Sequence, residues 1–237
     1  MVIIGWNDTN ATINSVTDSA GNTYSLAAGP TLLSGLASQS IYYAQNITSS
    51  PANGNAVTVT FSVAANYPDV RILEFSGIDP NNSLDSSGAA TNTGGSTATS
   101  GAVGTTSADD LLVAADYVQT LTAAVGAGFA LRMLTVPDGD LVEDSLTTAT
   151  GSYSASAPLV NPGWWVMQIV AFRAAGSPSP TTYPYAHAFA DSDPHSKPNC
   201  HSYTNANSNP KFRPGSSDSP ATCRNGNGSL AGHDLSR

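Results

Sequence analysis

The densest group of side chains that could do chemistry is acidic. Asp138, Asp140, Glu143 and Asp144 lie within seven residues of one another, with Gly139 available for a tight turn. Carboxylate oxygens are the ligands that Ca²⁺ takes in proteins. The spacing differs from that of an EF-hand, and three interpretations stay open. We favour a solvated acidic turn leading into a strand; a structural calcium site and a catalytic carboxylate pair are the alternatives.

Aromatic side chains form the second set of candidate functional residues. Indole and phenol rings offer flat apolar faces, on which the C–H faces of sugars can stack, together with a polar group. The candidate rings for a sugar-binding platform are Trp6, Tyr42, Tyr43, Tyr67, Trp164 and Trp165. Two pairs of these rings are adjacent in sequence, and neighbouring side chains of a strand point to opposite faces. We expect one ring of each pair in the core and the other exposed. Core packing is the alternative for every ring, whereas an exposed ring beside Asp or Asn on a concave face would favour sugar binding.

Two further acidic positions are interpreted as structural. Asp109-Asp110 precedes an apolar run, where charged residues protect the end of a strand. Glu74 falls in the expected strand 70–76, on the face opposite to Arg71. If Glu74 is buried, it needs a cation, which Arg132 or Arg173 would supply.

All four histidines and both cysteines follow residue 175. A Ser-His-Asp triad, a cysteine nucleophile and a His-ligated zinc site are therefore excluded from residues 1–175. Gly126-Ala127-Gly128 lacks the strand–turn–helix context of a dinucleotide site. An enzyme built from these residues would have to use carboxylates, as glycosidases do. We expect no enzymatic activity, and a carboxylate-based glycoside hydrolase is the least favoured function.

The composition limits the possible partners. The 237 residues are 40% hydrophobic and only 11% charged, with a formal charge of −9, whereas ordinary domains carry about 25% charged residues. Residues 1–175 hold three arginines and no lysine against thirteen acidic residues, a formal charge of −10. Nucleic-acid binding needs a basic face, and a membrane span needs about 20 apolar residues. We therefore expect neither nucleic-acid binding nor membrane insertion.

Strands are the elements that must position these residues. Residues 57–63 alternate apolar side chains with Ser and Thr, which is typical of a half-buried antiparallel strand. The tract 86–107 predicts a surface loop or an irregular edge strand, and residues 18–22 predict a hairpin turn with Gly21 at positive φ. Together the pattern favours an all-β antiparallel sandwich, jelly-roll-like, with an immunoglobulin-like sandwich as the alternative. The other expected strands are 2–6, 12–17, 23–28, 40–47, 70–76, 110–118, 127–134, 141–146, 151–157 and 164–173.

Residues 176–237 differ in composition, since they contain no Val, Ile, Met or Trp. Such a segment cannot offset the entropy cost of ordering, which predicts a disordered tail or linker. Positions 182–211 alternate between Ser, Pro, Thr or Ala and Tyr, His, Asn or Asp, with the exceptions Phe189, Lys197, Cys200 and Lys211. A Pro-Thr repeat read one base out of frame encodes this alternation, and we favour that origin over a genuine linker of odd composition. The histidines of the tail, with Cys200 and Cys223, lack a rigid scaffold, so we assign them no chemistry.

The chain begins directly in the apolar run 2–6, with no basic segment, signal-peptide core or cleavage site. Taken literally, this start indicates a cytoplasmic protein. The alternative is an internal start, with earlier strands and a secretion signal missing. We favour truncation and therefore an extracellular protein.

Six segments together resemble a known module: Gly5-Trp6-Asn7-Asp8-Thr9, 16–24, 41–44, 57–61, 72–79 and 165–173. They are similar to an uncharacterised β-sandwich module of large secreted bacterial multidomain proteins with Pro/Thr-rich linkers. The resemblance covers roughly residues 2–175 and carries strands and turns, with no catalytic signature. It implies a secreted module with a non-catalytic binding or structural role. We expect a module that binds polysaccharide or cell-surface glycans, with a structural spacer of an adhesin-like protein as the alternative. Other domains of a larger secreted protein would be its neighbours.

Overall fold

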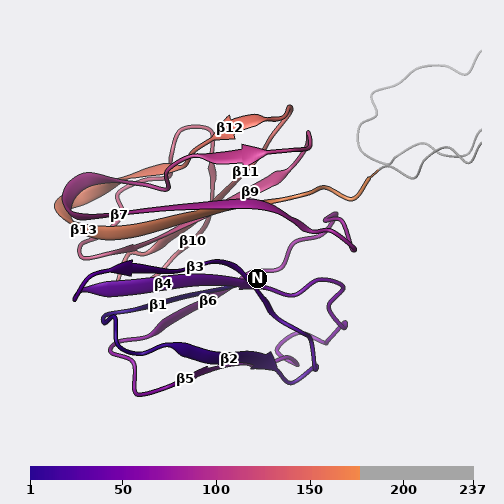
Figure 1. The fold of residues 1–237 in the computed structure, drawn as a ribbon, viewed down its shortest axis with the longest axis horizontal. Helices are drawn as coiled ribbons and strands as arrows, with labels where there is room; N and C mark the ends of the chain where they lie inside the picture. Colours follow the sequence, from indigo (N-terminus) through magenta and orange to yellow (C-terminus); the bar gives the residue numbers. More distant parts are fainter. Residues whose placement is uncertain (177–237) are drawn as a thin grey trace, which may run out of the picture. The chain divides into compact units, whose positions relative to one another are not determined.

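A computed structural model describes residues 1–176, which contain strands and no helix (Figure 1). Two large antiparallel sheets lie face to face, which confirms the expected all-β antiparallel sandwich. Within residues 1–176 no helix is long and apolar enough to cross a membrane. The predictions of a disordered tail and of an out-of-frame repeat concern residues outside the described part.

The first large sheet is built from residues near the start of the chain. Its strands, in spatial order, are β3 (Ser25–Leu33), β4 (Ala37–Tyr43), β1 (Val2–Trp6) and β6 (Asp69–Ile72). All three pairings are antiparallel. The central strand β1 consists of Val-Ile-Ile-Gly-Trp and is buried along its whole length.

The second large sheet comes from the later residues. Its strands, in spatial order, are β10 (Ala130–Leu134), β11 (Leu141–Leu146), β9 (Leu111–Val118), β13 (Ser156–Phe172) and β7 (Leu84–Thr99). The small-residue tract predicted as a loop or irregular edge strand forms most of β7, which is an edge strand that follows β13 antiparallel along nearly its whole length.

Two small sheets complete a stack of layers. They are the pair β2 (Ile13–Asp18) and β5 (Val57–Phe61), and the pair β8 (Val103–Thr105) and β12 (Gly151–Tyr153). In Figure 1 the β2–β5 pair lies below the four-stranded sheet, and β12 lies above the five-stranded sheet. The two large sheets are therefore each covered on both faces.

The apolar side chains form a separate core in each gap between layers. In β9, Leu112 and Ala114 pack toward the β8–β12 side, whereas Val113 and Ala115 pack toward the four-stranded sheet. Likewise in β1, Ile3 faces the five-stranded sheet, and its neighbours pack against the β2–β5 pair. Strands buried on both faces need continuous apolar runs rather than alternation. This explains the mostly apolar sequences of β1, β9 and the second half of β13.

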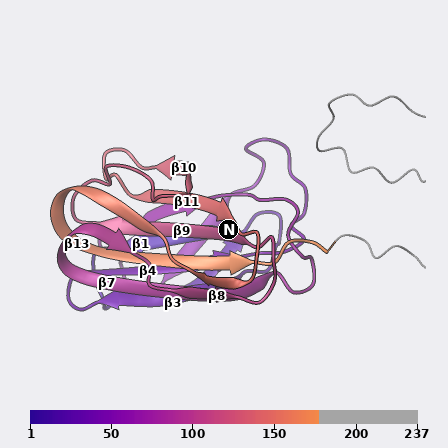
Figure 2. The same ribbon diagram turned by 90° about the horizontal axis from the view of Figure 1, so that it is seen from above.

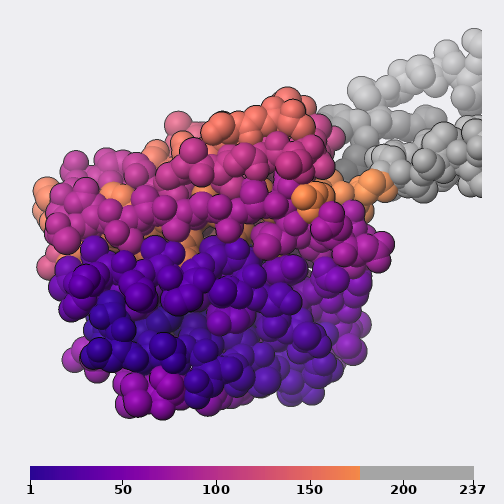
Figure 3. All heavy atoms as spheres, viewed as in Figure 1, coloured from indigo at the N-terminus to yellow at the C-terminus, as the bar shows by residue number. Residues whose placement is uncertain are grey.

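The two large sheets are drawn from different halves of the chain. Figure 3 shows the N-terminal residues gathered in one half of the described unit, and Figure 2 shows the same strands from above. This order differs from the alternation between sheets that the two Greek keys of a jelly roll produce. The turn at residues 18–22 joins β2 to β3, which belong to different sheets. The hairpin predicted there is therefore wrong, although Gly21 does adopt a φ of 76°.

Candidate functional site

Loops and strand ends from five parts of the chain enclose one hollow of about 770 Å³. This volume is within the usual range for small-molecule sites, about 300–1,000 Å³. We call it the Tyr67 hollow. Its rings are Tyr67, Tyr117 and Trp164, and its polar residues include Asn7, Asp69, Asp138, Asp140 and Asn161.

Tyr67 presents the most exposed ring of the site. Its side chain is 83% exposed, although its backbone lies in the left-handed region with a φ of 46°. That conformation is unfavourable for a bulky residue, and such strain is typical of functional sites. The hydroxyl of Tyr117 donates a hydrogen bond of 3.1 Å to the carbonyl of Tyr67 and so holds the loop in place.

The Gly-Trp-Asn-Asp segment supports this loop from behind. Gly5 leaves room for the ring of Tyr117, since a Cβ at that position would clash with several ring atoms. The carboxylate of Asp8 accepts hydrogen bonds from the N–H groups of Asn10 and Ala11 within its own turn. It also accepts one of 2.8 Å from the N–H of Asn66, next to Tyr67. These backbone hydrogen bonds, the one from Ala11 foremost, lower the pKa of Asp8.

Asp140 is the buried acid of the hollow, with 1% of its surface exposed. Its Oδ1 accepts a hydrogen bond of 2.9 Å from the N–H of Val118. Its Oδ2 is buried and has no hydrogen-bond partner. Burial raises the pKa of Asp140 to about 7, with Arg71 opposing the shift. The buried Oδ2 of Asp140 is thus left without a donor from the protein.

Arg71 ties the two large sheets together beneath the hollow. It is 1% exposed and pairs with Asp69 at 3.0 Å between Nε and Oδ2. Its Nη1 donates to the carbonyls of Asp116 and Leu141 in the five-stranded sheet, at 2.7 and 3.1 Å. Its Nη2 donates to Oε1 of Gln39 at 3.1 Å. A guanidinium can satisfy this many acceptors because its donors form a fixed fork.

Alternation in strand 70–76 places Arg71 on the face opposite to Val70 and Ile72, as expected, and the face that turns inward is the one that carries the arginine. Arg71 faces the interior, whereas Val70 and Ile72 are 41% and 50% exposed. The strand β6 ends at Ile72, and Glu74 lies beyond it and is exposed. Because Glu74 is exposed, it does not need the cation that Arg132 or Arg173 was expected to supply to a buried Glu74. A hydrophobicity pattern cannot predict that the face with Arg71 is buried, because the acceptors for its guanidinium come from distant strands.

Two of the six candidate rings, Tyr67 and Trp164, line the hollow. Trp164 is half-buried and lies against Tyr117, with ring centroids 6.0 Å apart and planes tilted by 47°. Its neighbour Trp165 is 4% exposed and belongs to the core, as does Trp6 at 1%. Alternation therefore separates the two tryptophans, with Trp165 in the core as expected and Trp164 half-buried rather than exposed.

Tyr42 and Tyr43 do not follow the expected division into a buried and an exposed ring. Both are half-buried, because layers cover both faces of their sheet. Tyr42 packs on the core beneath the β2–β5 pair. Tyr43 packs edge-to-face on Phe172, with centroids 5.4 Å apart. Neither ring lines the Tyr67 hollow.

The four acids considered as calcium ligands are not brought together, and the favoured interpretation of a solvated acidic turn is wrong for Asp140, Glu143 and Asp144, which are buried. Asp138 and Asp140 line the hollow. Glu143 accepts a hydrogen bond of 2.6 Å from the N–H of Gly126, and Asp144 pairs with Arg132, with 2.6 Å between Nε and Oδ2. Successive residues of β11 point to opposite faces, which separates these side chains. Among residues 1–176, no group of three or more His, Cys, Asp or Glu side chains could hold a metal ion.

Sequence reasoning missed Asp116 of the second sheet and did not predict the burial of Glu143 and Asp110. Asp116 accepts hydrogen bonds from the N–H of Leu141 and the hydroxyl of Thr122, at 2.6 and 2.7 Å. Burial raises the pKa of Asp116 to about 6 and that of Glu143 to about 7. Burial and the carboxylate of Asp85 raise the pKa of Asp110 to about 7. Asp110 is fully buried and Asp109 is exposed, so the interpretation as charged residues that protect a strand end fits Asp109 but is wrong for Asp110.

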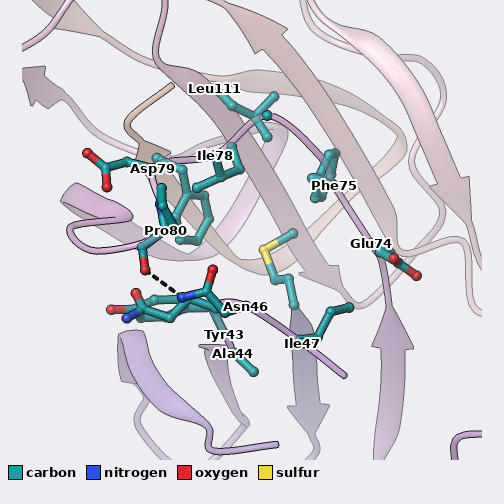
Figure 4. Close-up of a pocket in the computed structure, with 14 residues that line it drawn as sticks. Tyr43, Ala44, Asn46, Ile47, Glu74, Phe75, Ile78, Asp79, Pro80 and Leu111 are labelled. Atoms are coloured by element: carbon teal, nitrogen blue, oxygen red, sulfur yellow. Dashed lines mark hydrogen bonds between the residues drawn. The ribbon is translucent and has the colours of Figure 1, made fainter. Parts of the chain in front are cut away.

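A second pocket lies beside Tyr43 at another place in the sandwich (Figure 4). It encloses about 230 Å³ and is lined by Phe75, Ile78 and Leu111 among other apolar residues. A hydrogen bond of 2.8 Å from Nδ2 of Asn46 to the carbonyl of Pro80 crosses its mouth. This volume is below the usual range for ligand sites, about 300–1,000 Å³. We interpret it as a packing gap and place the candidate site at the Tyr67 hollow.

Comparisons of the chain with protein-family models, with curated proteins and with solved structures found no match.

Proposed function

We propose that residues 1–176 form a non-catalytic binding module for glycans and that the Tyr67 hollow is the binding site. The observation that carries the proposal is the exposed ring of Tyr67, which lies on a strained backbone and lines the same hollow as Trp164 and the buried carboxylate of Asp140. Backbone strain persists only where the surrounding structure maintains it. Here Tyr117 and Asp8 maintain it.

The chemistry of the lining suits a sugar. The ring of Tyr67, with Trp164 beside it, offers apolar faces for sugar C–H groups. Asn7, Asn161 and Asp138 supply amide and carboxylate groups to hydrogen-bond hydroxyls. Sites of this type combine apolar walls with a few placed polar groups.

The proposed setting is extracellular, within a larger secreted protein that has further domains. The support is the low charge of the chain and its resemblance to secreted modules. A glycan-binding module would there attach its neighbours to a polysaccharide or to cell-surface glycans.

The test is a glycan panel followed by calorimetric titration of the tightest ligand. We expect Tyr67→Asn to weaken binding by about fivefold, since a stacking ring is worth about 1 kcal/mol. Asn tolerates the left-handed conformation, so the loop should be preserved. Leu146→Ala is the matched control, because Leu146 is 70% exposed and lies outside the hollow. That variant should bind as the parent does.

The panel is run with calcium and with a chelator, and the affinity should be equal in both. No binding to any glycan would contradict the proposal and favour a structural spacer. Release of reducing sugar from a bound glycan, abolished by Asp140→Asn, would contradict its non-catalytic part and favour a carboxylate hydrolase.

A further inference from the structure

The Tyr67 hollow has an excess of negative charge that the described residues do not balance. Residues 1–176 contain three arginines and neither lysine nor histidine. Arg132 pairs with Asp144 and Arg173 with Asp85, both away from the hollow. Arg71 pairs with Asp69 and directs its other donors to carbonyls and to Gln39. Three carboxylates line the hollow, and one guanidinium lies near them.

Asp140 has an unused acceptor at this site. Its Oδ2 is buried and has no hydrogen-bond partner, and the residue lines the hollow. A buried carboxylate oxygen without a donor is destabilising, because it has lost its hydration. A cationic donor that enters the hollow would restore that hydrogen bond with a charge-assisted one.

The rings of the hollow favour the same kind of ligand. The faces of Tyr and Trp rings carry negative potential and attract cations within about 6 Å. Tyr67, Tyr117 and Trp164 all line the hollow together with Asp138 and Asp140. A neutral sugar would stack on the rings but would leave the carboxylates uncompensated. A sugar with an ammonium group would satisfy both.

Resting on the proposed glycan-binding function, we propose that the Tyr67 hollow recognises glycans with free ammonium groups, such as oligomers of glucosamine. The sugar ring would stack on Tyr67, and the ammonium group would lie between Asp138 and Asp140. The protein then selects its ligand by charge as well as by shape.

The test compares three probes with the full 237-residue chain near neutral pH: a glucosamine oligomer, the N-acetylated oligomer of the same length, and oligolysine. We expect the glucosamine oligomer to bind at least about tenfold more tightly than the acetylated one. The difference should shrink as salt is added. Equal binding of both sugars overturns the ammonium preference and leaves the glycan function standing. Binding of neither sugar overturns the ammonium inference, whereas the glycan function is overturned only if the whole glycan panel also shows no binding.

Oligolysine separates a glycan site from a general cation site. Oligolysine that binds as tightly as the glucosamine oligomer overturns the inference, because charge alone would then suffice. Asp138→Asn should weaken glucosamine binding about threefold to fivefold. Asp109→Asn removes the same charge outside the hollow, at an exposed position with a φ of 62° that Asn tolerates. An equal loss in both variants overturns the inference, since it would indicate attraction by net charge.

Discussion

The carboxylate of Asp18, in the turn after β2, accepts four hydrogen bonds, whereas that of Asp140 in the Tyr67 hollow accepts one. The donors to Asp18 are the N–H and side chain of Asn22, the hydroxyl of Tyr24 and the side chain of Asn55. Burial opposes these hydrogen bonds, yet they lower the pKa of Asp18 well below its usual range. Burial of Asp140 raises its pKa instead.

This difference separates a structural acid from one that is available to a ligand. Both carboxylate oxygens of Asp18 accept hydrogen bonds within the protein, one at Oδ1 and three at Oδ2, so that its negative charge stabilises the turn. Asp140 keeps a buried oxygen without a donor at the wall of a hollow. Density of acids in the sequence does not distinguish the two, because the donors decide which acid is satisfied.

The largest effect should follow from removal of the cation nearest the hollow. Arg71→Met leaves Asp69 unpaired and three acceptors without their donor, and losing one partner of a buried ion pair costs about 3–5 kcal/mol. Denaturant unfolding measures this loss. Arg132→Met is the control, because Arg132 is 49% exposed, and its loss should be much smaller. Similar losses of stability in the two variants would contradict the inference that Arg71 links the two large sheets.

The second effect concerns the support behind Tyr67. Gly5→Ala forces the buried ring of Tyr117 to move, and overpacking of this kind costs about 1–3 kcal/mol. The variant should also weaken glycan binding, since Tyr117 holds the Tyr67 loop. Gly21→Ala, in the turn that contains Asp18, meets no neighbouring atoms; it should lose stability through its positive φ alone and keep full binding. Full binding in Gly5→Ala would contradict the role of Tyr117.

The two acids should produce opposite limbs of the stability–pH profile. The pKa of Asp140 is raised to about 7 in the folded protein, so the folded state binds more protons than the unfolded state between about pH 4 and 7. Stability therefore falls as pH rises through that window. The pKa of Asp18 is lowered, so its contribution is present above about pH 4 and is lost in more acidic solution.

The free energy of unfolding, measured from pH 3 to pH 8, should thus reach a maximum near pH 4–5, where it should exceed its value at pH 8 by about 1 kcal/mol or more. Asp140→Asn should flatten the neutral limb in part, since Asp116, Glu143 and Asp110 also have raised pKa values. Asp18→Asn should flatten the acidic limb in part, since Asp8, Asp79 and Asp85 also have lowered pKa values. A parent profile that rises from pH 5 to pH 8 would contradict the burial of these acids.

The smallest effect on stability should come from removal of the Tyr67 ring. Tyr67→Asn removes a side chain that is 83% exposed and relieves strain at a φ of 46°. The free energy of unfolding should change by less than about 0.5 kcal/mol, while glycan binding weakens. A large loss of stability would indicate that the ring serves the fold.

Sequence patterns predicted the strands well where local periodicity determines them. The alternation of residues 57–61 matches the half-buried strand β5, and the apolar run of 165–172 matches the core part of β13. The small-residue tract that forms β7 was harder to assign, because its Ser, Thr, Gly and Ala side chains carry no apolar period. Its long pairing with β13 supplies the backbone hydrogen bonds that make it a strand.

The candidate site could be predicted only as separate pieces. Tyr67, Trp164, Asp138 and Asp140 were each singled out by residue type, yet nothing local indicated that they share a hollow. Trp6 and Trp165 were equally good candidates by type and are buried in the core. Contacts between residues far apart in the chain decided which of them meet.

The sequence by itself determined the fold class, because period-two alternation, turn residues and the lack of a helical stripe are local properties of the chain. It also excluded histidine and cysteine chemistry from residues 1–175. Only the tertiary structure decided the four layers, the inward turn of Arg71 and the contrast between Asp18 and Asp140. These features depend on where distant donors and apolar faces lie, and no local pattern encodes that placement.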